Sequence, residues 1–484
     1  MRPSGFSTGC WLFSSLFIAL AGCSGSSNPG SSTNAKPTRH NVLLVTLDTT
    51  RRDHFGCYGD ARGLTPNFDT LAAEGVRFDL AIVTAAATPV SHASILSGLY
   101  QFKHGLRVIY AATARSLPPA VPTLATVLKQ AGWSTGAFLS SFTVSEEFGL
   151  QRGFEHWDNG LSVPADSIFH PTADGARFMW EVESCQRRSD QTTDKTLEWI
   201  KATSAPFLAW IHYWDPHDDG IMPPSEILDR FKLQTLDGDA RKLALYQAEV
   251  AYVDQQFGRL VKGLQAAGKY DDTLIVVISD HGEGLGDHNW WSHRLTYQEQ
   301  IHVPLIIRIP GGPKGRVVPE LVRAVDLYPT IFQCLGVPLP SPVDGKPLQP
   351  LMDRKPDGPR MAYADQLNLF DLNASVVVKR PLDDLLYVAM DQSWKLIYRR
   401  RHAEQSELYN IATDPRELKN VFNEYPAEVA RLRKFLDSLG CYRDEPFGVG
   451  ATDSEAIRRL KSLGYAGDDD DATSTTQPAS KPVP

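Results

Sequence analysis

Two apolar runs, far apart in the chain, each end in residues that commonly bind metal ions. The first is Asn41–Asp48 (NVLLVTLD) and the second is Thr273–His281 (TLIVVISDH). Short runs rich in Val, Ile and Leu are typical of strands buried on both faces of a parallel sheet. Because ligands bind beyond the carboxyl ends of such strands, we expect Asp48, Asp280 and His281 to lie together at one edge of an α/β sheet.

A hydroxyl-rich segment between these runs, Thr88-Pro-Val-Ser-His92, opens a further apolar stretch. A hydroxyl beside two carboxylates and an imidazole suggests metal-assisted attack on an anionic ester. A Thr hydroxyl is a weak nucleophile at neutral pH, and a cation lowers its pKa and polarises the ester oxygen. If Thr88 opens a helix, the helix N-terminus also favours an anionic group. A simple N-cap is the alternative role for Thr88, and the two roles are compatible.

The predicted cofactor is a divalent metal cation. Carboxylates suit a hard cation such as Ca²⁺ or Mg²⁺, whereas an added imidazole moves the preference toward Mn²⁺ or Zn²⁺. The predicted metal site comprises Asp48, Thr88, Asp280 and His281. For Asp48, a cap or turn at the end of a strand is the alternative interpretation.

The first residues are typical of an export signal and not of the fold. A basic start at Arg2 precedes Trp11–Leu20, an apolar stretch too short to span a bilayer as a stable anchor. Leu20-Ala-Gly-Cys23 is similar to the bacterial lipoprotein signal, in which the Cys is lipidated and becomes the mature N-terminus; an ordinary secretory signal is the alternative. We expect residues 1–23 to be this signal and residues 24–38 a flexible linker. The protein is then exported and anchored at a membrane, on the periplasmic or cell-surface side.

The chain has 484 residues, which is enough for one large α/β domain and a smaller one. Its net charge is -8, and no basic stripe interleaved with aromatic residues stands out, so nucleic acid is not an expected partner. Export permits disulfides, but spacing names no pair and isolated thiols are the favoured interpretation. Beyond the signal, the cysteines are Cys57, Cys185, Cys334 and Cys441.

Strand and helix patterns alternate from Asn41 to about Leu339. This alternation favours an α/β fold with a mostly parallel central sheet and helices on both faces. We expect this catalytic domain to occupy residues 39–353. The predicted elements are strands at Val42–Leu47, Phe207–His212, Thr273–Ser279 and Pro304–Arg308, and helices at Asn67–Glu74, Val121–Ala131 and Gln247–Ala267.

Beyond about Arg354 the pattern changes, and we expect a smaller α+β subdomain with antiparallel strands over residues 354–467. Residues 468–484 combine an acidic run with Ser, Thr and Pro, so this tail is expected to be disordered. The predicted elements of the subdomain are strands at Ser375–Lys379, Leu386–Met390 and Trp394–Arg399, and a helix at Glu424–Leu439.

A series of motifs follows in a fixed order: Leu47–Asp53, Thr65–Asp69, Thr88–Gly98, Trp214–His217, Ser279–Glu283 with His293, Val303–Ile307, Asp326–Thr330 and Leu408–Glu417. Each motif alone is weak, but the ordered set resembles the sulfatase family of the alkaline phosphatase superfamily, over roughly Asn41–Gly467. The resemblance implies an alkaline-phosphatase-like fold, a divalent cation, and a nucleophile at the start of a helix that attacks sulfur or phosphorus. The matching positions are Asp48, Asp280 and His281 for the metal ligands, Thr88 for the nucleophile, His217 and His293 for contact with the ester or its leaving group, and His92 for an Arg that supports the nucleophile.

Some positions depart from the family pattern. The sulfatase signature is Cys or Ser, any residue, Pro, any residue, Arg, whereas here Thr88 is followed directly by Pro and His92 replaces the Arg. Asp48 is followed by Thr49 where a second Asp is common, and Phe138–Phe142 stands where a Lys-x-His is usual. Because Thr is not a known substrate for formylglycine conversion, these departures favour phosphate or phosphonate ester chemistry, or group transfer.

The sequence therefore predicts a metal-dependent hydrolase of sulfate or phosphate esters, whose substrate is a sulfated or phosphorylated glycan, lipid or small molecule. One alternative is a phosphodiester or phosphonate hydrolase, or a transferase of the phosphoglycerol or phosphoethanolamine type. Another is a non-catalytic binder of sulfated or phosphorylated glycans, against which the retained metal ligands argue. A structural role is the interpretation for His104, His212, His288 and His302.

Overall fold

The computed structural model describes residues 39–109, 111, 114–162, 185–204, 206–217, 221–371, 374–447 and 459. The predicted signal peptide, linker and C-terminal tail lie outside these described residues. They stay predictions, as do the limits of the two domains.

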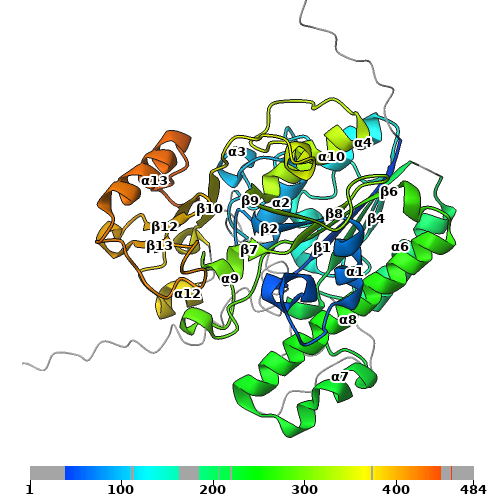
Figure 1. The fold of residues 1–484 in the computed structure, drawn as a ribbon, viewed down its shortest axis with the longest axis horizontal. Helices are drawn as coiled ribbons and strands as arrows, with labels where there is room; N and C mark the ends of the chain where they lie inside the picture. Colours follow the sequence, from blue (N-terminus) through cyan, green and yellow to red (C-terminus); the bar gives the residue numbers. More distant parts are fainter. Residues whose placement is uncertain are drawn as a thin grey trace, which may run out of the picture. The chain divides into compact units, whose positions relative to one another are not determined.

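The large central sheet is built from nine strands in the described residues: β1 (Asn41–Leu47), β2 (Val76–Ile82), β3 (Ser134–Phe138), β4 (His156–Asp158), β5 (Phe207–Tyr213), β6 (Thr273–Ser279), β7 (His302–Val303), β8 (Leu305–Arg308) and β9 (Arg316–Arg323). Their order is β4-β3-β5-β1-β6-β8-β2-β7, with β9 paired to β2 (Figure 1). The run from β4 to β6 is parallel, whereas β8 is antiparallel to both β6 and β2. The predicted, mostly parallel central sheet is confirmed.

Helices cover both faces of this sheet: α1 (Pro66–Glu74), α2 (Thr88–Ser97), α4 (Leu124–Gln130), α6 (Ser189–Ala202), α8 (Gly238–Ala266) and α10 (Leu327–Leu335). Successive residues of β1 point to opposite faces, as the period of two in a strand requires. Leu44 belongs to a core with α2, α4 and α10, whereas Val45 belongs to a core with α1, α6 and α8. Shorter helices complete the domain: α3 (Gln101–His104), α7 (Ser225–Phe231), α9 (Gln298–Ile301) and α11 (Gln349–Met352).

Two helices begin three or more residues away from their predicted starts. Helix α4 begins at Leu124 and not at Val121, because Thr123 caps it through a reciprocal pair of hydrogen bonds with Thr126. Helix α8 begins at Gly238, well before the predicted Gln247. Its first turns pack in a small satellite cluster and not in the main core, so they lack the regular apolar spacing on which the prediction depended.

The C-terminal region forms a separate antiparallel sheet of β10 (Ala362–Gln366), β11 (Leu386–Met390), β12 (Trp394–Arg399) and β13 (Glu407–Asn410), with helix α13 (Pro426–Leu439) against it (Figure 1). The predicted strand at Ser375–Lys379 is wrong, because this segment is helix α12 (Ala374–Lys379). Val376 is buried whereas Val378 is 77% exposed, and residues two apart in a strand would share a face. The run of valines suggested a strand, but tertiary packing selects the helix.

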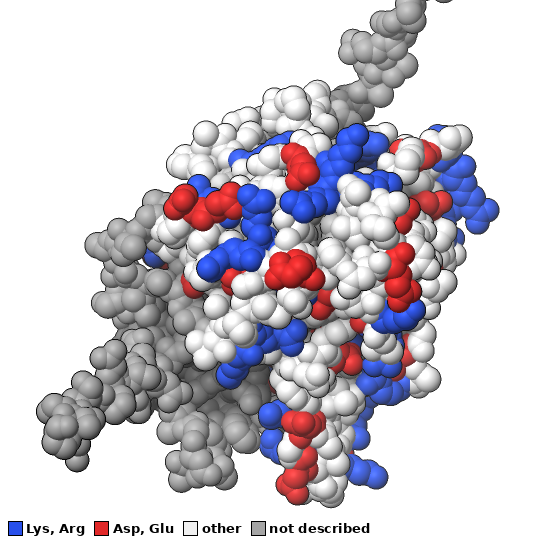
Figure 2. Space-filling model, turned by 90° about the vertical axis from the view of Figure 1, so that its left-hand side faces the viewer, with Lys and Arg blue, Asp and Glu red and all other residues white. Residues whose placement is uncertain are grey.

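None of the helices in the described ranges is both long and apolar enough to cross a membrane. Among the described residues, Cys57, Cys185, Cys334 and Cys441 form no disulfide. Figure 2 shows basic and acidic side chains interspersed over the face that it displays. Such interspersion brings opposite charges together, as where Arg431 of α13 contacts both Asp391 and Glu428.

Candidate active site

Pairing of the strands places Asp48 and Asp280 side by side. Strand β1 lies between β5 and β6, and Leu47 is opposite Ser279 in the parallel register with β6. The next residue of each strand is therefore an aspartate at the carboxyl edge of the sheet. Both aspartates are fully buried, and His281 follows immediately. The structure brings together three of the four residues of the predicted metal site, and the fourth, Thr88, lies beside His281.

Each carboxylate uses one oxygen to hold its place and leaves the other without a hydrogen-bond partner in the described part of the chain. Oδ2 of Asp48 accepts a hydrogen bond from Nε2 of His212 at 3.0 Å. Oδ1 of Asp280 accepts from the backbone N–H of His281 at 2.7 Å and of Thr49 at 3.3 Å. The remaining oxygens, Oδ1 of Asp48 and Oδ2 of Asp280, are buried and unpaired. Unpaired buried oxygens of this kind need a cation or a proton.

The tautomer of His281 suits a metal ligand. Its Nδ1 lies 2.9 Å from the carbonyl oxygen of Gly282, which can only accept, so Nδ1 carries the proton. Nε2 then presents a lone pair, 3.9 Å from Oδ1 of Asp48 and 3.6 Å from Oδ2 of Asp280. Fixing the ring through its other nitrogen is usual for metal-binding histidines.

The spacing of these donors fits a divalent cation. One atom from each of Asp48, Asp280 and His281 can be chosen so that all lie within 4.8 Å of one another. Ligands about 2.4 Å from a Ca²⁺ ion are separated by at most about 4.8 Å. The two carboxylates and one imidazole therefore form a possible metal site whose donors suit several divalent ions.

The electrostatics of the site also favour a bound cation. Burial, with the neighbouring charges of Asp280 and Glu283, raises the pKa of Asp48 well above its usual value. Burial likewise raises the pKa of Asp280, although backbone N–H groups oppose it. Burial lowers the pKa of His281, which keeps the imidazole neutral. Two like charges in a dry site cannot both ionise readily without a cation between them.

Thr88 lies beside the acidic pair, at the first residue of α2. Its Oγ1 is 3.2 Å from Nε2 of His281, and its side chain is fully buried. The residue that caps α2 is Ala87, and no side chain caps the helix, so the alternative role of Thr88 as N-cap is wrong. The helix N-terminus faces the site as expected, which places partial positive charge next to the hydroxyl.

His92 lies beneath Thr88 and is fully buried. Its Nδ1 donates to the backbone carbonyl of Thr88 at 2.7 Å, and its Nε2 is 3.0 Å from Oγ1 of Thr46. Ser91 donates to the backbone carbonyl of Asp280 at 2.6 Å. Both ring nitrogens of His92 thus have partners inside the protein, so His92 supports the first turn of α2.

His217 and His293 form an imidazole cluster with His281. The rings of His293 and His281 are 4.7 Å apart, and those of His217 and His293 are 5.0 Å apart. His217 stacks on Trp214 at 3.7 Å, which fixes its plane. Nδ1 of His293 contacts Oε2 of Glu283 at 3.1 Å. The predicted catalytic histidines therefore gather around one centre with the metal ligands and Thr88.

Two residues of this centre were not predicted from the sequence. His212 was interpreted as structural, yet it orients the Asp48 carboxylate. It is opposite Thr46 in the pairing of β5 with β1, so the strand-end argument that identified Asp48 also applies to it. Glu283 contacts His293 and is buried, and this burial raises its pKa to about 8. The sequence feature that could have identified Glu283 is its position shortly after the Asp280-His281 motif.

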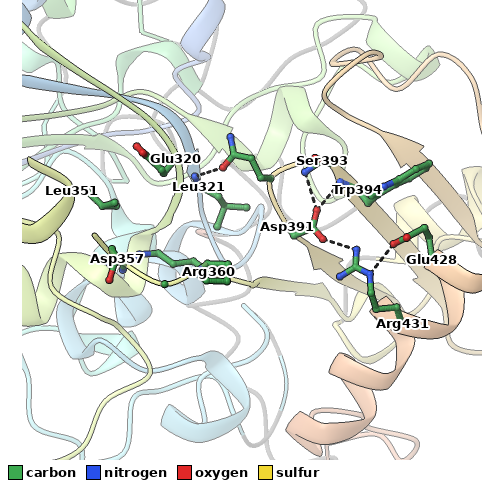
Figure 3. Close-up of a pocket in the computed structure, with 13 residues that line it drawn as sticks. Glu320, Leu321, Leu351, Asp357, Arg360, Asp391, Ser393, Trp394, Glu428 and Arg431 are labelled. Atoms are coloured by element: carbon green, nitrogen blue, oxygen red, sulfur yellow. Dashed lines mark hydrogen bonds and ion pairs between the residues drawn. The ribbon is translucent and has the colours of Figure 1, made fainter. Parts of the chain in front are cut away.

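A separate cavity of about 680 Å³ lies between β9, the segment around Arg360, the turn after β11 and α13 (Figure 3). No predicted site residue lines it. Its two arginines are already paired, Arg360 with Asp357 at 2.6 Å and Arg431 with Asp391 at 2.5 Å. Because these cations are neutralised, the cavity is poorly suited to an anionic group, unlike the strand-end site.

Comparison with known proteins agrees with this geometry. The profile of the sulfatase family matches residues 40–337, and that of the C-terminal region of N-sulphoglucosamine sulphohydrolase matches residues 286–439. The chain is 26% identical to an N-acetylglucosamine-6-O-sulfatase of Bacteroides thetaiotaomicron, over 87% of this chain and 88% of the relative.

Solved structures share the fold. One, in complex with its substrate D-glucosamine-2-N,6-O-disulfate, has a TM-score of 0.64 and 23% identity, over 84% of this chain and 99% of the other. The phosphonate monoester hydrolase of Agrobacterium radiobacter has a TM-score of 0.63 and 23% identity, over 83% of this chain and 95% of the hydrolase. With the family profile matched over more than half of its length, the chain belongs to the sulfatase family, within the alkaline phosphatase superfamily.

Proposed function

We propose that this protein hydrolyses sulfate or phosphate esters, with Thr88 as the nucleophile and a divalent cation held by Asp48, Asp280 and His281. The observation that carries the proposal is the convergence of two buried carboxylate oxygens, which accept no hydrogen bond from the described residues, and the Nε2 lone pair of His281 beside the Thr88 hydroxyl. When bound, the cation would lower the pKa of the hydroxyl and polarise the ester.

The residues of the chain divide the remaining work. Oγ1 of Thr88 gives up its proton to solvent and forms a bond to phosphorus or sulfur while the bond to the leaving oxygen breaks, and the leaving oxygen takes up a proton. Water then hydrolyses the ester on Thr88, which releases phosphate or sulfate and restores the hydroxyl. Ser91 fixes the first turn of α2 to the backbone of Asp280, directly after β6, and His92 links that turn to Thr46 of β1. His217 and His293 lie over the centre, where an imidazole N–H can hydrogen bond to the leaving oxygen.

Sugar sulfates are the first substrate class to consider, because relatives of similar length are named for them. One is an N-acetylglucosamine-6-O-sulfatase, and a structural neighbour contains a glucosamine disulfate. Phosphonate and phosphate esters are the second class, supported by the phosphonate monoester hydrolase fold and by Thr at the nucleophile position. A transferase would use the same Thr88 intermediate but pass the group to an alcohol instead of water.

A purely binding role is the remaining alternative. It is disfavoured because a binder gains nothing from two buried carboxylates that are unstable without a cation. The decisive experiment compares aryl sulfate, phosphate monoester, phosphodiester and phosphonate substrates across Ca²⁺, Mg²⁺, Mn²⁺ and Zn²⁺. Turnover that disappears in Thr88→Ala supports the proposal, whereas sulfate turnover that survives it would mean that another group attacks.

We also propose that the protein is a membrane-anchored lipoprotein, on the sequence Leu20-Ala-Gly-Cys23 alone. Metabolic labelling with a fatty acid tests this assignment. Label on the wild-type chain but not on Cys23→Ala would support the anchor, and unlabelled, secreted wild-type protein would contradict it.

A further inference from the structure

We propose that His288 is a positioning residue, which in its doubly protonated form fastens the loop that carries His293 to the C-terminal subdomain. This proposal goes beyond the hydrolase function and rests on it only for the activity measurement. His288 was interpreted from the sequence as structural, and the structure gives it a more specific role.

Both ring nitrogens of His288 face groups that only accept hydrogen bonds. Nδ1 is 3.0 Å from Oε1 of Glu299, and Nε2 is 3.2 Å from the backbone carbonyl of Glu417. A neutral imidazole has a single N–H and can serve only one of them. The ring also stacks on Tyr297 at 3.8 Å with the planes 3° apart, an arrangement that favours a cation. The geometry therefore selects the imidazolium.

The backbone at His288 is in a conformation that must be held by its surroundings. His288 and the next residue, Asn289, have φ of 51° and 56°, in the left-handed region that non-glycine residues rarely adopt. His288 makes three links away from its own loop: the two ring contacts and a hydrogen bond from Nη1 of Arg380 to its carbonyl oxygen at 2.9 Å. Such links stabilise the unfavourable backbone conformation of His288 and Asn289, which form the tip of the loop.

The loop connects this tip directly to the active site. The backbone N–H groups of Gly284 and Gly286 donate to the carbonyls of Ser292 and Trp290, so the two sides of the loop are paired. Nε1 of Trp290 donates to the carbonyl of His293 at 2.7 Å. Movement of the tip is therefore passed along a paired ribbon to His293.

The acceptors on the other side are rigidly placed. The carboxylate of Glu417 pairs with Lys395 of β12 at 2.7 Å and accepts from the backbone N–H of Gln298 at 2.6 Å. Lys395 and Glu417 are both buried. The Glu417 carbonyl, which accepts a hydrogen bond from His288, thus belongs to a fixed part of the C-terminal subdomain.

The charges around His288 come from every neighbouring segment. Glu299 faces it from α9, and Asp287 beside it pairs with Arg51 at 2.9 Å and with Arg416 at 3.3 Å. Other charged groups nearby are Arg380 and the Lys395–Glu417 pair, and Arg52 and Asp53 line the cavity beside the ring. Glu299 is the anionic group that contacts the ring itself, so it is the group that stabilises the cation.

Solvent can reach this cluster. A cavity of about 320 Å³ is lined by His288 and Glu299 together with Asp287, Arg416 and Arg51. Proton exchange with bulk water therefore needs no unfolding. Burial lowers the pKa of His288, but the hydrogen bond and charge of Glu299 outweigh it and raise the pKa above the usual value. The link is therefore complete at acidic pH and is lost as pH rises through the raised pKa.

Three variants of the full-length chain test the proposal. His288→Asn removes the charge with a residue that tolerates positive φ. Glu299→Gln keeps the imidazole but removes its anionic partner, so the test survives if His288→Asn fails to fold. His402→Asn is the matched control, because His402 is a partly exposed histidine of the same subdomain outside the link.

The readouts are ¹³C NMR titration of labelled histidines, hydrogen–deuterium exchange of the Gly284 and Gly286 amides, and the pH dependence of kcat and KM. We expect His288 to titrate above about 6.5 and Glu299→Gln to lower that value. The protection of the two amides, which is the intrinsic exchange rate at each pH relative to their observed rate, should fall across the same pH range in the wild type. In His288→Asn their exchange should be faster by about tenfold below that pH and show no step. The kcat of the wild type should fall over the pH range in which protection falls, with KM nearly constant. His402→Asn should match the wild type in all three measurements.

The proposal is overturned if His288 titrates at or below about 6.5, or if His288→Asn and the wild type exchange these amides equally at low pH. Titration and exchange need no substrate, so they decide the matter even if no ester is turned over. Absence of turnover with every ester would count against the hydrolase function, but the titration and exchange measurements would still test the His288 link.

Discussion

Asp48 and Asp280 follow paired residues of adjacent parallel strands, and each retains one buried oxygen that is unpaired within the described part of the chain. Around the two carboxylates lie His212, His281 and Glu283. Because burial raises both pKa values, and the charge of Asp280 also raises that of Asp48, the metal-free protein holds these protons more tightly when folded than when unfolded. Their stability contribution is therefore present below about pH 4 and is lost as pH rises through the raised values.

This relationship predicts that divalent cations stabilise the protein more at about pH 8 than at about pH 5, because protons compete for the same oxygens at the lower pH. At about a thousand times Kd, the stabilisation should reach about 4 kcal/mol. Thermal unfolding of the chelator-treated protein, with and without each metal, measures it. Equal shifts of Tm at both pH values would contradict the assignment of these carboxylates as ligands.

Asp280→Asn should have opposite effects on stability and on metal binding. It removes one of two buried like charges, so the metal-free variant should be more stable than the metal-free wild type at about pH 8, by about 1–3 kcal/mol. The same variant should lose the stabilisation by metal. Urea unfolding of both proteins with chelator checks the first effect, and a metal-free variant that is less stable than the wild type would show that the carboxylates are not in conflict.

His212→Asn should weaken metal binding without removing a ligand. His212 donates to Oδ2 of Asp48 and so orients the other oxygen. Loss of such an orienting partner typically costs about 10–100-fold in metal affinity. Isothermal titration with the metal that supports turnover measures the loss, and unchanged affinity would return His212 to the structural role that the sequence suggested.

The loss of turnover caused by Glu283→Gln or His293→Gln should depend on the leaving group. If His293, held by Glu283, hydrogen bonds to the leaving oxygen, turnover of esters of alcohols should fall by about 10²–10⁴-fold. Aryl esters with acidic phenols need little help and should lose much less. Linear free-energy plots for both variants and the wild type give the comparison, and parallel plots would place His293 away from the leaving group.

The sequence predicted the elements that set the site, and the physical reasons are specific. β6 has the predicted bounds, and β1 and α1 each differ from prediction by one residue, because long apolar runs and regular spacing dominate there. The valines of Ser375–Lys379 misled because strand propensity does not resolve which face is buried. His212 was missed because its role depends on the neighbour of β5 in the sheet, and strand order is not visible in local patterns.

The central claim is that Thr88 attacks the ester with the help of a cation at Asp48, Asp280 and His281. The most direct measurement is rapid-quench mass spectrometry of the protein with an activated aryl phosphate or sulfate, with metal or chelator. If Thr88 is the nucleophile, a phosphoryl or sulfuryl group forms on the peptide that contains Thr88, only with metal, and is absent from Thr88→Ala. Steady turnover with no adduct, undiminished in Thr88→Ala, would contradict it.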